Sequence, residues 1–559
     1  MTIRVSERSD VYADHPDLPD WPQSLLDRHG SRMLRPVEAA RVPGGRPTPQ
    51  SLSTVYRSAV LLFPRSVLLD ANLLEKIEKE INVTGVSLLT DGKTPPSPAL
   101  PDQLRRLDDR YTALFPIPVV LVAYGKNAVE IDAWKALQQI RTASSQGRLD
   151  AHPGLDLISL EHLMVGANYG GVPTWGPRDI RDSADDGGPN ASYRMLPVAY
   201  TGAPPLRGKK PPGGRRVVIA VPDTGLNAHP WFGLKKLGDP LPAGGFLHRF
   251  EASEAAIMAQ QQRLDTLTPT DILTEAWESA TYDDTVTENV SRATGHFTFI
   301  AGRILQNAPD ADVLAMRVLH SDNICYEADL LLAMWLLVDR ITNAQSDKDI
   351  VDIVSISLGG YVETESSKAS HLRTVLRALA ELGVIVVAAA GNDSTTRRFY
   401  PAAFATEAAD SSDPWPGPPV VAVGALNPDD TQAWFSNAGP NVTVEATGAN
   451  VLSTFPPSVR GPVGPGRITR SGKRQSADAD LYATGFAIGS GTSYAAPEVA
   501  AQLARYLVKQ SVPITEVGKD LMRERAMQAI KSFRKDHSPQ RNRTSFWIWL
   551  ALAIRRAST

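Results

Sequence analysis

Runs of consecutive apolar residues divide the second half of the chain into buried strands. Residues 217–221 form one such run and end in Asp223 and a Gly turn, and residues 384–388 form another that is followed by Asn392. Runs of this length without alternation are typical of parallel strands covered on both faces. The pattern therefore predicts an α/β fold in which Asp223 and Asn392 lie at the carboxyl ends of strands, where such proteins build their sites.

Two further segments have helical spacing and begin with reactive side chains. Ser493 precedes an amphipathic stretch marked by Val499, Leu503 and Leu507, and His296 opens the apolar stretch that runs to Gly302. A helix start offers free N–H groups and a partial positive charge, which suit a nucleophile that must form an oxyanion nearby. Each residue alone also has a structural interpretation, because Ser is a common helix cap and a single His is often part of a core.

The motifs around these residues occur in a specific order along the chain. Asp223 stands in Asp-Thr-Gly, His296 in Gly-His-Phe-Thr-Phe-Ile-Ala-Gly and Ser493 in Gly-Thr-Ser-Tyr-Ala-Ala-Pro. Between them lie Ser-Leu-Gly-Gly at 357–360 and Ala-Ala-Gly-Asn at 389–392. A neutral imidazole can take the proton of a Ser hydroxyl when a buried carboxylate fixes its tautomer, and the order Asp, His, Ser is the one used by subtilisin.

This ordered set resembles the subtilisin-like serine proteases, over about residues 213–510. The resemblance implies a three-layer fold with a mostly parallel central sheet. It also implies a serine endopeptidase in which Asp223, His296 and Ser493 form the triad and Asn392 donates to the oxyanion. Ser357, Leu358 and Gly359 match the strand edge that binds the substrate, and Phe399 stands before the family's Tyr-Pro, where a small residue is usual. A benzyl group there predicts a pocket that accepts small side chains such as Ala or Ser.

The sequence also departs from the family pattern. Phe297 and Phe299 replace the small Gly and the second His that normally follow the catalytic His. Two stretches are insertions relative to compact relatives: one contains a predicted helix over 251–263, and the other covers 460–487. Long loops near a site are often functional, and either could form a rim over the substrate groove or a plain surface excursion.

The chain upstream of the catalytic motifs predicts a second, smaller domain. Strands are predicted over 55–63, 83–89, 118–123 and 155–163, and helices over 71–81 and 129–142. This βαββαβ order is that of a ferredoxin-like α+β unit. It is similar to subtilase propeptide domains, which cover the groove and feed an extended tail into the site; a generic interaction domain is the alternative. A propeptide would be cleaved within 164–171, with that stretch paired to the edge at 357–359.

Length and composition set the expected domain plan. A chain of 559 residues is too long for a single core. The net charge of −3 excludes a global attraction to nucleic acid or anionic membrane. We predict a disordered or loosely packed segment over residues 1–50 and a ferredoxin-like domain over 51–168. A linker that ends in a basic run follows over 169–212. The catalytic domain covers 213–512, and a helical extension covers 513–559.

The remaining composition points to a cytoplasmic protein without cofactors. Cys325 is the single Cys, so neither an intrachain disulfide nor a Cys-based zinc site is expected. The first ten residues carry charges throughout and lack a signal core. No Asp-x-Asp-x-Asp-Gly spacing of a calcium loop is seen, and a protein or peptide substrate is the expected partner. The apolar run 546–554 is too short to span a bilayer and is expected to dock on the protein or to lie at an interface.

Two other functional classes are weighed against a protease. An esterase or acyl transferase on an α/β-hydrolase scaffold would need Gly-x-Ser-x-Gly, whereas Ser493 stands in Gly-Thr-Ser-Tyr-Ala. A peptide-binding module on a subtilase scaffold, without catalysis, is the second alternative, and the changes at Phe297 and Phe299 keep it open.

Overall fold

A computed structural model describes most of the chain. The described residues are 2–6, 21–35, 52–89, 93–125, 130–167, 195–210, 214–278, 282–284, 289–364, 370–409, 413–461, 466–475 and 481–538. The apolar run 546–554 lies outside them. Within these ranges, no helix combines the length and the apolar character that crossing a membrane would require.

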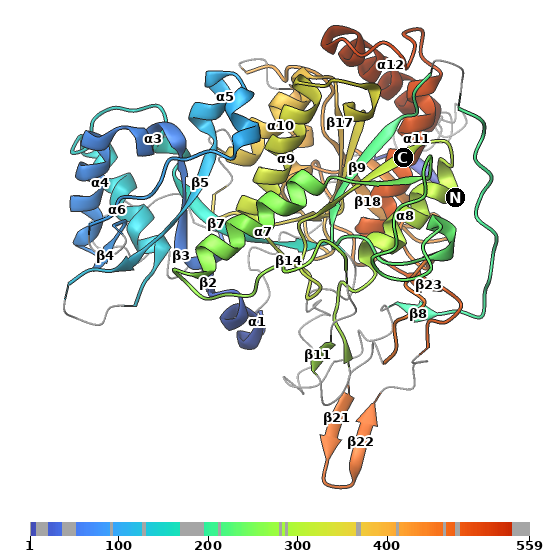
Figure 1. The fold of residues 1–559 in the computed structure, drawn as a ribbon, viewed down its shortest axis with the longest axis horizontal. Helices are drawn as coiled ribbons and strands as arrows, with labels where there is room; N and C mark the ends of the chain where they lie inside the picture. The colour runs from blue at the N-terminus through green and yellow to red at the C-terminus, as the bar shows by residue number, and fades with distance from the viewer. Residues whose placement is uncertain are drawn as a thin grey trace, which may run out of the picture.

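The catalytic half is built on one eight-stranded sheet, which confirms the predicted α/β fold (Figure 1). Its order is β1-β19-β18-β17-β15-β9-β13-β10, and all pairs are parallel except β1 with β19. The strands are β1 (Ile3–Val5), β9 (Val218–Asp223), β10 (Leu247–Arg249), β13 (Asp312–Arg317), β15 (Ile353–Ile356), β17 (Ile385–Ala389), β18 (Val421–Leu426) and β19 (Val444–Thr447).

Helices cover both faces of this sheet and make the three layers. Alternate side chains of β9 enter opposite cores: Ile219 and Val221 pack with α8 and α11, whereas Val218 and Ala220 pack on the side of α9 and α10. The helices are α7 (Glu251–Asp265), α8 (His296–Asn307), α9 (Glu327–Thr342), α10 (His371–Glu381) and α11 (Thr492–Val508). Past residue 512, α12 (Lys519–His537) packs on α11, so the described part of the extension is helical as predicted.

The N-terminal domain has the predicted βαββαβ order. β3 (Thr54–Pro64) pairs antiparallel with both β7 (Ser159–Gly166) and β5 (Pro116–Val120), and β6 (Val122–Ala123) pairs with β4 (Val86–Ser87). The two helices that pack on this sheet are α4 (Ala71–Asn82) and α6 (Ala133–Ser145). The bounds differ from the prediction at two strands. The strand predicted over 83–89 is only Val86–Ser87, and at the last strand residues 155–157 form a 3-10 turn (η2, Leu155–Leu157) and the strand continues to Gly166.

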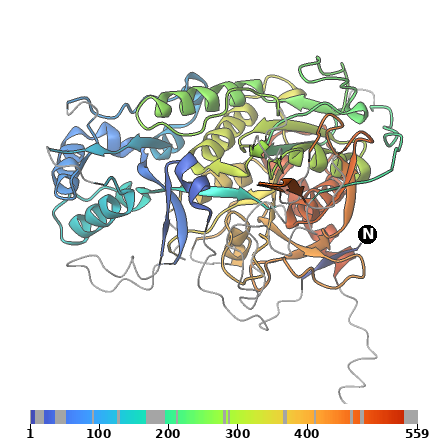
Figure 2. The ribbon, with the colours of Figure 1, turned by 90° about the horizontal axis from the view of Figure 1, so that it is seen from below.

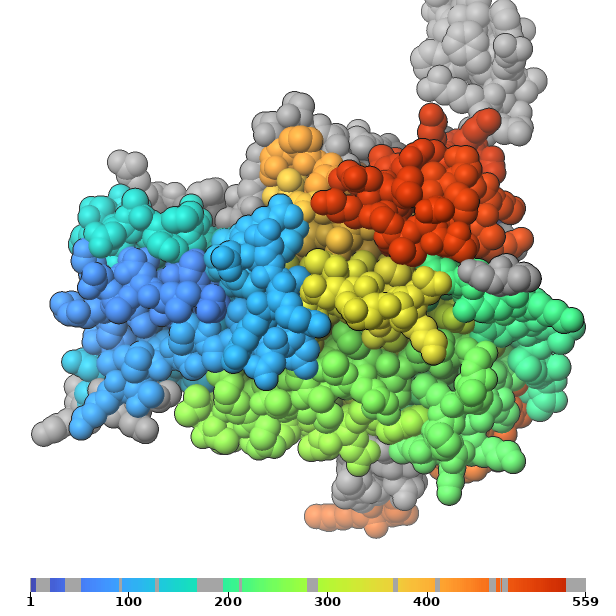
Figure 3. All heavy atoms as spheres, turned by 45° about the horizontal axis from the view of Figure 1, so that its top comes forward, coloured from blue at the N-terminus to red at the C-terminus, as the bar shows by residue number. Residues whose placement is uncertain are grey.

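Shorter elements fill the connections of this domain. They are α3 (Arg65–Leu69), η1 (Asp102–Arg106) and α5 (Asp109–Leu114). From α5, the Tyr111 ring packs 5.4 Å from that of Trp335 on α9. One buried apolar core therefore runs from the N-terminal domain into the catalytic domain. The space-filling view shows the two domains seated against each other (Figure 3).

The prediction of a loosely packed N-terminal segment is wrong for its described parts. β1 adds a strand to the edge of the central sheet through β19, with Arg4 in an ion pair with Glu445. α1 (Gln23–Arg28) leads into β2 (Ser31–Leu34), which pairs with β3. β1 gains its hydrogen bonds from a strand far away in sequence, which a local pattern does not reveal.

The basic run before β9 is bonded to the protein through its arginines, whereas Lys209 and Lys210 are exposed. Arg215 is buried and donates two hydrogen bonds to Asp352, at 2.5 and 2.6 Å. Arg216 donates to the carbonyls of Gly208 and Asp310. Arg215 and Arg216 therefore fix the end of the run to the protein just before β9 begins.

The two insertions lie in different places: α7 lies across the middle of the view in Figure 1, and the hairpin over 466–475 lies below the body. α7 bears out the helix predicted over 251–263. The second insertion contains the hairpin of β21 (Gly466–Thr469) and β22 (Gly472–Gln475), which projects away from the body, and β23 (Phe486–Gly489), which pairs with β20 (Val451–Thr454) and β8 (Leu196–Pro197). The short pair β11 (Tyr282–Asp284) and β12 (Asn289–Val290) follows the first insertion.

β7 physically joins the two domains. It leaves the N-terminal sheet beside β3 and runs between β14 (Ile324–Tyr326) and β16 (Leu358–Gly359) of the catalytic domain, antiparallel to both. The views agree on this course, with β7 crossing from one domain into the other (Figures 1 and 2). Its last residues thus enter the edge that the sequence assigned to substrate.

Candidate active site

A carboxylate and an imidazole meet at the end of β9. Asp223 is the last residue of that strand and His296 the first of α8, and both side chains are fully buried. The Nδ1 atom of His296 lies 2.8 Å from Oδ1 and 2.9 Å from Oδ2 of Asp223. Asp223 also accepts a hydrogen bond from the Thr224 N–H at 2.7 Å. A carboxylate held in this way fixes Nδ1 as the protonated nitrogen and leaves Nε2 able to accept a proton.

Ser493 lies in the first turn of α11, which packs against α8. Its hydroxyl donates a hydrogen bond to the carbonyl of Ser357 at 3.0 Å. The Nε2 atom of His296 has no hydrogen-bond partner among the residues that the structure describes. The predicted nucleophile and base thus sit on adjoining helix starts, with the hydroxyl turned to the strand edge.

Asn392 follows β17 and lies beside the same helix start. Its Oδ1 accepts from the Thr492 N–H at 2.9 Å and from the Thr492 hydroxyl at 3.0 Å. This fixes the amide orientation and turns Nδ2 away from Thr492. Nδ2 is buried and has no partner within the described part of the chain, so it is a free donor on a side chain that is anchored to the start of α11.

The two departures at the start of α8 pack inside the protein. Phe297 and Phe299 are fully buried, and the ring of Phe299 lies 4.3 Å from that of Tyr494. Tyr494 in turn lies 5.6 Å from the ring of His296. The large side chain at 299 is thus matched by the aromatic residue next to Ser493, and this pair forms one wall behind His296.

A buried acid that sequence reasoning missed supports this helix start. Glu278 is fully buried, and both its oxygens lie 3.0 Å from the N–H of Gly295, the residue before His296. Burial raises the pKa of Glu278 to about 8, against the opposing effects of Arg317 and of the Gly295 hydrogen bond. The aromatic-acidic stretch from Trp277 is visible in the sequence, but its contact with a helix distant in sequence is not.

The strand edge is occupied by the chain itself. Leu358 pairs with Gly166 and Gly359 with Val165, and the N–H of Ala167 donates to the carbonyl of Ser357 at 2.8 Å. The carbonyl of Ala167 accepts from the backbone N–H of Ser493 at 2.9 Å. A peptide carbonyl therefore lies at the helix start that also holds the candidate nucleophile. Part of the stretch predicted for cleavage, residues 168–171, lies outside the described residues.

Two side chains restrict the space beside this strand. Phe399 is buried, and a Cβ placed on Gly359 would come within 2.5 Å of its ring. The ring also packs against Tyr361, with centroids 5.2 Å apart. A Cβ placed on Gly166 would lie 2.3 Å from Oδ1 of Asn323, whose Nδ2 donates to the Gly166 carbonyl. The site thus leaves little room for a side chain at position 166, and Phe399 fills the space beside Gly359.

Ionisable side chains are buried where β7 meets the catalytic domain, and we call Arg57, Glu161, His162, Glu327 and Glu363 the charged seam. His162 Nδ1 lies 2.6 Å from Glu327 and Nε2 lies 2.9 Å from Glu363, while Arg57 donates to Glu161 at 3.1 Å. Burial alone would lower the pKa of His162, but the two carboxylates raise it to about 10. Burial alone would raise the pKa of Glu363, but His162 and Arg141 lower it to about 2.

Comparison with known families identifies one match. The model of the subtilase family matches residues 214–541, which include all three candidate triad residues and α12.

Several curated proteins are similar to this chain, and among them are two from Bacillus subtilis (strain 168) and one from Trichophyton verrucosum. The major intracellular serine protease of B. subtilis is 32% identical over 181 residues, which cover 30% of this chain and 49% of that protein. Subtilisin-like protease 1 of T. verrucosum is 27% identical over 310 residues, covering 52% and 64%. Subtilisin E of B. subtilis is 32% identical over 174 residues, covering 29% and 39%. The chain thus matches less than two thirds of the length of each.

Among solved structures, a Ser-to-Ala mutant of the protease domain of PatA matches 53% of this chain and 80% of that chain. The sequence identity is 19% and the TM-score is 0.33.

Proposed function

The chain belongs to the subtilase family, and from this premise we propose that it is a serine endopeptidase that cleaves its own chain between Ala167 and Asn168. The observation that carries the proposal is the Ala167 carbonyl, which accepts a hydrogen bond from the Ser493 N–H while the residues before it pair with β16. A bound substrate strand would adopt this arrangement, with its scissile carbonyl at the nucleophile.

In this proposal the three side chains act as one unit. The Ser493 hydroxyl turns from the Ser357 carbonyl to Nε2 of His296, gives up its proton there and attacks the Ala167 carbonyl carbon. Asp223 holds Nδ1 and stabilises the imidazolium. His296 then protonates the leaving amine of Asn168, and the chain up to Ala167 remains as an ester on Ser493. Water attacks that ester, which yields the Ala167 carboxylate and restores the Ser.

The oxyanion formed during attack has two candidate donors. One is the N–H of Ser493, which already bonds the Ala167 carbonyl at 2.9 Å. The other is Nδ2 of Asn392, whose orientation is fixed by the bonds of Oδ1 to Thr492. Donors preorganised in a buried site stabilise developing charge strongly because they need no reorganisation, and removal of one such donor from subtilisin lowers turnover by about 10²–10³-fold.

The same geometry supports a preference for small residues next to the cleaved bond. Phe399 fills the space beside Gly359, on the same strand edge whose Ser357 carbonyl accepts the N–H of Ala167. Asn323 excludes a Cβ at the preceding position, where the chain has Gly166. We therefore propose that substrates ending in Gly-Ala before the cleaved bond are preferred, and that the domain over residues 51–168 acts as a propeptide. Cytoplasmic location stays a prediction.

Covalent labelling tests the enzymatic proposal directly. A fluorophosphonate probe reacts with a Ser only when a competent base activates it. The wild-type protein should be labelled at Ser493, and S493A and H296A should not. An exposed-site control, Ser471→Ala, should be labelled like the wild type. Equal labelling of S493A, or no labelling of a wild type that still binds peptides, would overturn the proposal and favour a peptide-binding module.

A further inference from the structure

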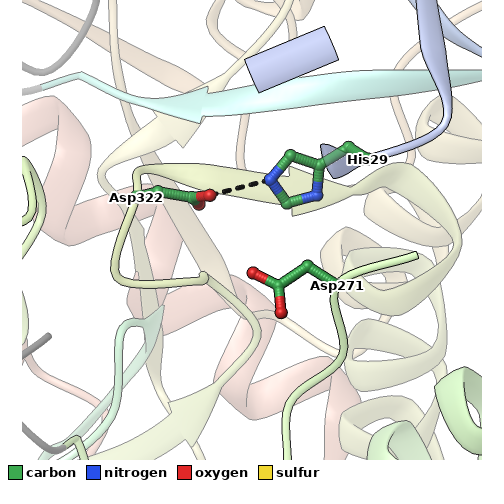
Figure 4. A group of neighbouring side chains, drawn as sticks. All are labelled: His29, Asp271 and Asp322. Atoms are coloured by element: carbon green, nitrogen blue, oxygen red, sulfur yellow. Dashed lines mark hydrogen bonds and ion pairs between the residues drawn. The ribbon is translucent and has the colours of Figure 1, made fainter. Parts of the chain in front are cut away.

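A second cluster of titratable side chains lies away from the triad, where three distant segments meet. His29 follows α1, Asp271 lies in the loop after α7, and Asp322 lies in the turn before β14. One donor atom from each lies within 4.8 Å of the others. The three side chains point toward one another (Figure 4).

The hydrogen bonds around His29 determine which of its nitrogens carries a proton. The hydroxyl of Tyr326 donates to the carbonyl of Asp271 at 2.9 Å, which uses its only proton. Nδ1 of His29, 2.8 Å from the same hydroxyl, must therefore be the donor in that contact. Nε2 then faces Oδ2 of Asp322 at 2.9 Å. An imidazole lone pair and an ionised carboxylate cannot face each other at this distance unless a proton or a cation lies between them.

The surrounding groups leave coordination capacity unused. The Asp322 side chain is only 7% exposed, and its Oδ1 has no hydrogen-bond partner among the described residues. The Asp271 carboxylate is 44% exposed, so the cluster opens to solvent on one side. Arg28 donates to Oδ2 of Asp322 at 3.0 Å, and His320 Nδ1 lies 3.8 Å from Oδ2 of Asp271. These are the other charged or titratable groups that contact the two carboxylates.

We propose that His29, Asp271 and Asp322 bind a divalent transition-metal ion of the zinc class. One imidazole nitrogen and two carboxylate oxygens are a donor set that Zn²⁺ accepts, with solvent completing the shell on the open side. Tetrahedral zinc bonds of about 2.0–2.2 Å place neighbouring donors about 3.3–3.6 Å apart. Nε2 and Oδ2, which lie 2.9 Å apart, therefore need to separate by only about 0.5 Å to hold the ion between them. The Tyr326 hydroxyl fixes the tautomer of His29 in which Nε2 is free to bind the ion. In metal sites, a hydrogen-bond partner of the other ring nitrogen commonly orients the ligating His in this way.

The site would join the two products of self-cleavage. His29 lies before the Ala167–Asn168 bond, whereas Asp271 and Asp322 lie after it. Asp322 also belongs to the turn that leads into β14, the strand that pairs with β7. A metal ion would therefore latch the cleaved N-terminal fragment to one wall of the groove, and its removal would favour release. This second step rests on the proposed function, whereas metal binding does not.

The first experiment measures binding of Zn²⁺ alone to the full chain carrying S493A, which keeps the protein uncleaved. Calorimetry should give one ion per chain, and Co²⁺ should give visible absorption bands of a site with nitrogen and oxygen ligands. D271N, at a partly exposed position, and H29N should each weaken binding at least about tenfold, within the range found for the loss of ligand-supporting groups. His248→Asn, an exposed His 3.6 Å from a single carboxylate, should change nothing.

No uptake of Zn²⁺, the same affinity in D271N and H29N as in the parent, or Ca²⁺ binding as tight as Zn²⁺ would overturn the site. The unfolding midpoint of each variant, measured without metal, shows whether that variant is folded. If H29N does not fold, the affinity of D271N for Zn²⁺ decides whether the site exists. In the cleaved wild type, a chelator should speed separation of the two fragments, and D271N should already release faster. Zinc binding with no effect on release would overturn the latch, and absence of cleavage would count against the proposed function instead.

Discussion

The interior of the catalytic domain and the charged seam are equally buried, but they are built from different chemistry. Aliphatic side chains such as Ile219, Ile353 and Val387 fill the interior below α8 and α11. The seam places His162 between Glu327 and Glu363. Apolar contacts carry no titratable charge and are insensitive to pH, whereas a buried charge depends on its partner and costs about 3–5 kcal/mol when that partner is removed. The seam therefore makes the contact between the two domains sensitive to pH and to single substitutions, whereas the apolar core that they share does not titrate.

The largest effect is expected in the interior, at Asp223. Replacement by Asn keeps the size but allows the wrong tautomer of His296, and the same change in the chymotrypsin triad lowers turnover by about 10⁴. The rate at which the full chain cleaves itself, followed by electrophoresis, should fall on this scale. Asp429→Asn at a solvent-exposed loop is the control. Cleavage of D223N within tenfold of the wild type would contradict the role of Asp223.

The next effect concerns the seam. His162→Gln removes the cation between two buried carboxylates, so the cleaved fragment should dissociate on the order of 10²- to 10³-fold more readily. The double variant H162Q/E363Q should recover part of this loss because it also removes one unpaired charge. Size-exclusion chromatography of the cleaved protein measures both. If H162Q holds its fragment as firmly as the wild type, the charged seam does not decide release.

The seam also predicts a pH dependence with a definite sign. The pKa of His162 is about 10 in the intact protein, above the ordinary value of 6.5, because of Glu327 and Glu363. The contribution of protonated His162 is therefore complete below pH 6.5 and is lost as the pH rises toward 10. Fragment affinity should fall by at most about tenfold per pH unit between about pH 7 and 9. H162Q should flatten this slope, and affinity that instead rises with pH would contradict the assignment.

The smallest effect is expected at the wall of the groove. Phe399→Gly should open space beside Gly359 and raise the ratio of cleavage after Leu or Phe to cleavage after Ala by about tenfold, the low end for a hydrophobic pocket. Peptides that differ only at that position measure the ratio. Trp434→Gly, at an exposed aromatic residue, is the control. A wild type that already cuts after Phe as readily as after Ala would refute the blocked pocket.

The difference between the apolar interior and the charged seam also explains which features could be predicted from the sequence. The strand β9, the start of α8 and the start of α11 are contiguous blocks whose apolar runs and motifs identify them without their neighbours. Glu161 and His162 lie in a strand with the pattern Ser-Leu-Glu-His-Leu, which is typical of a half-exposed strand, yet catalytic-domain residues distant in sequence bury both. β1 was missed for the same reason, since its partner β19 is remote in sequence.

The central claim is that the chain presents Ala167 to Ser493 as its own substrate. Intact-mass spectrometry of purified wild type and S493A, with sequencing of any new termini, tests it most directly. The account predicts two fragments from the wild type, one ending at Ala167 and one beginning at Asn168, and a single intact chain from S493A. An active wild type that remains a 559-residue chain, or cleavage at the same bond in S493A, would contradict it.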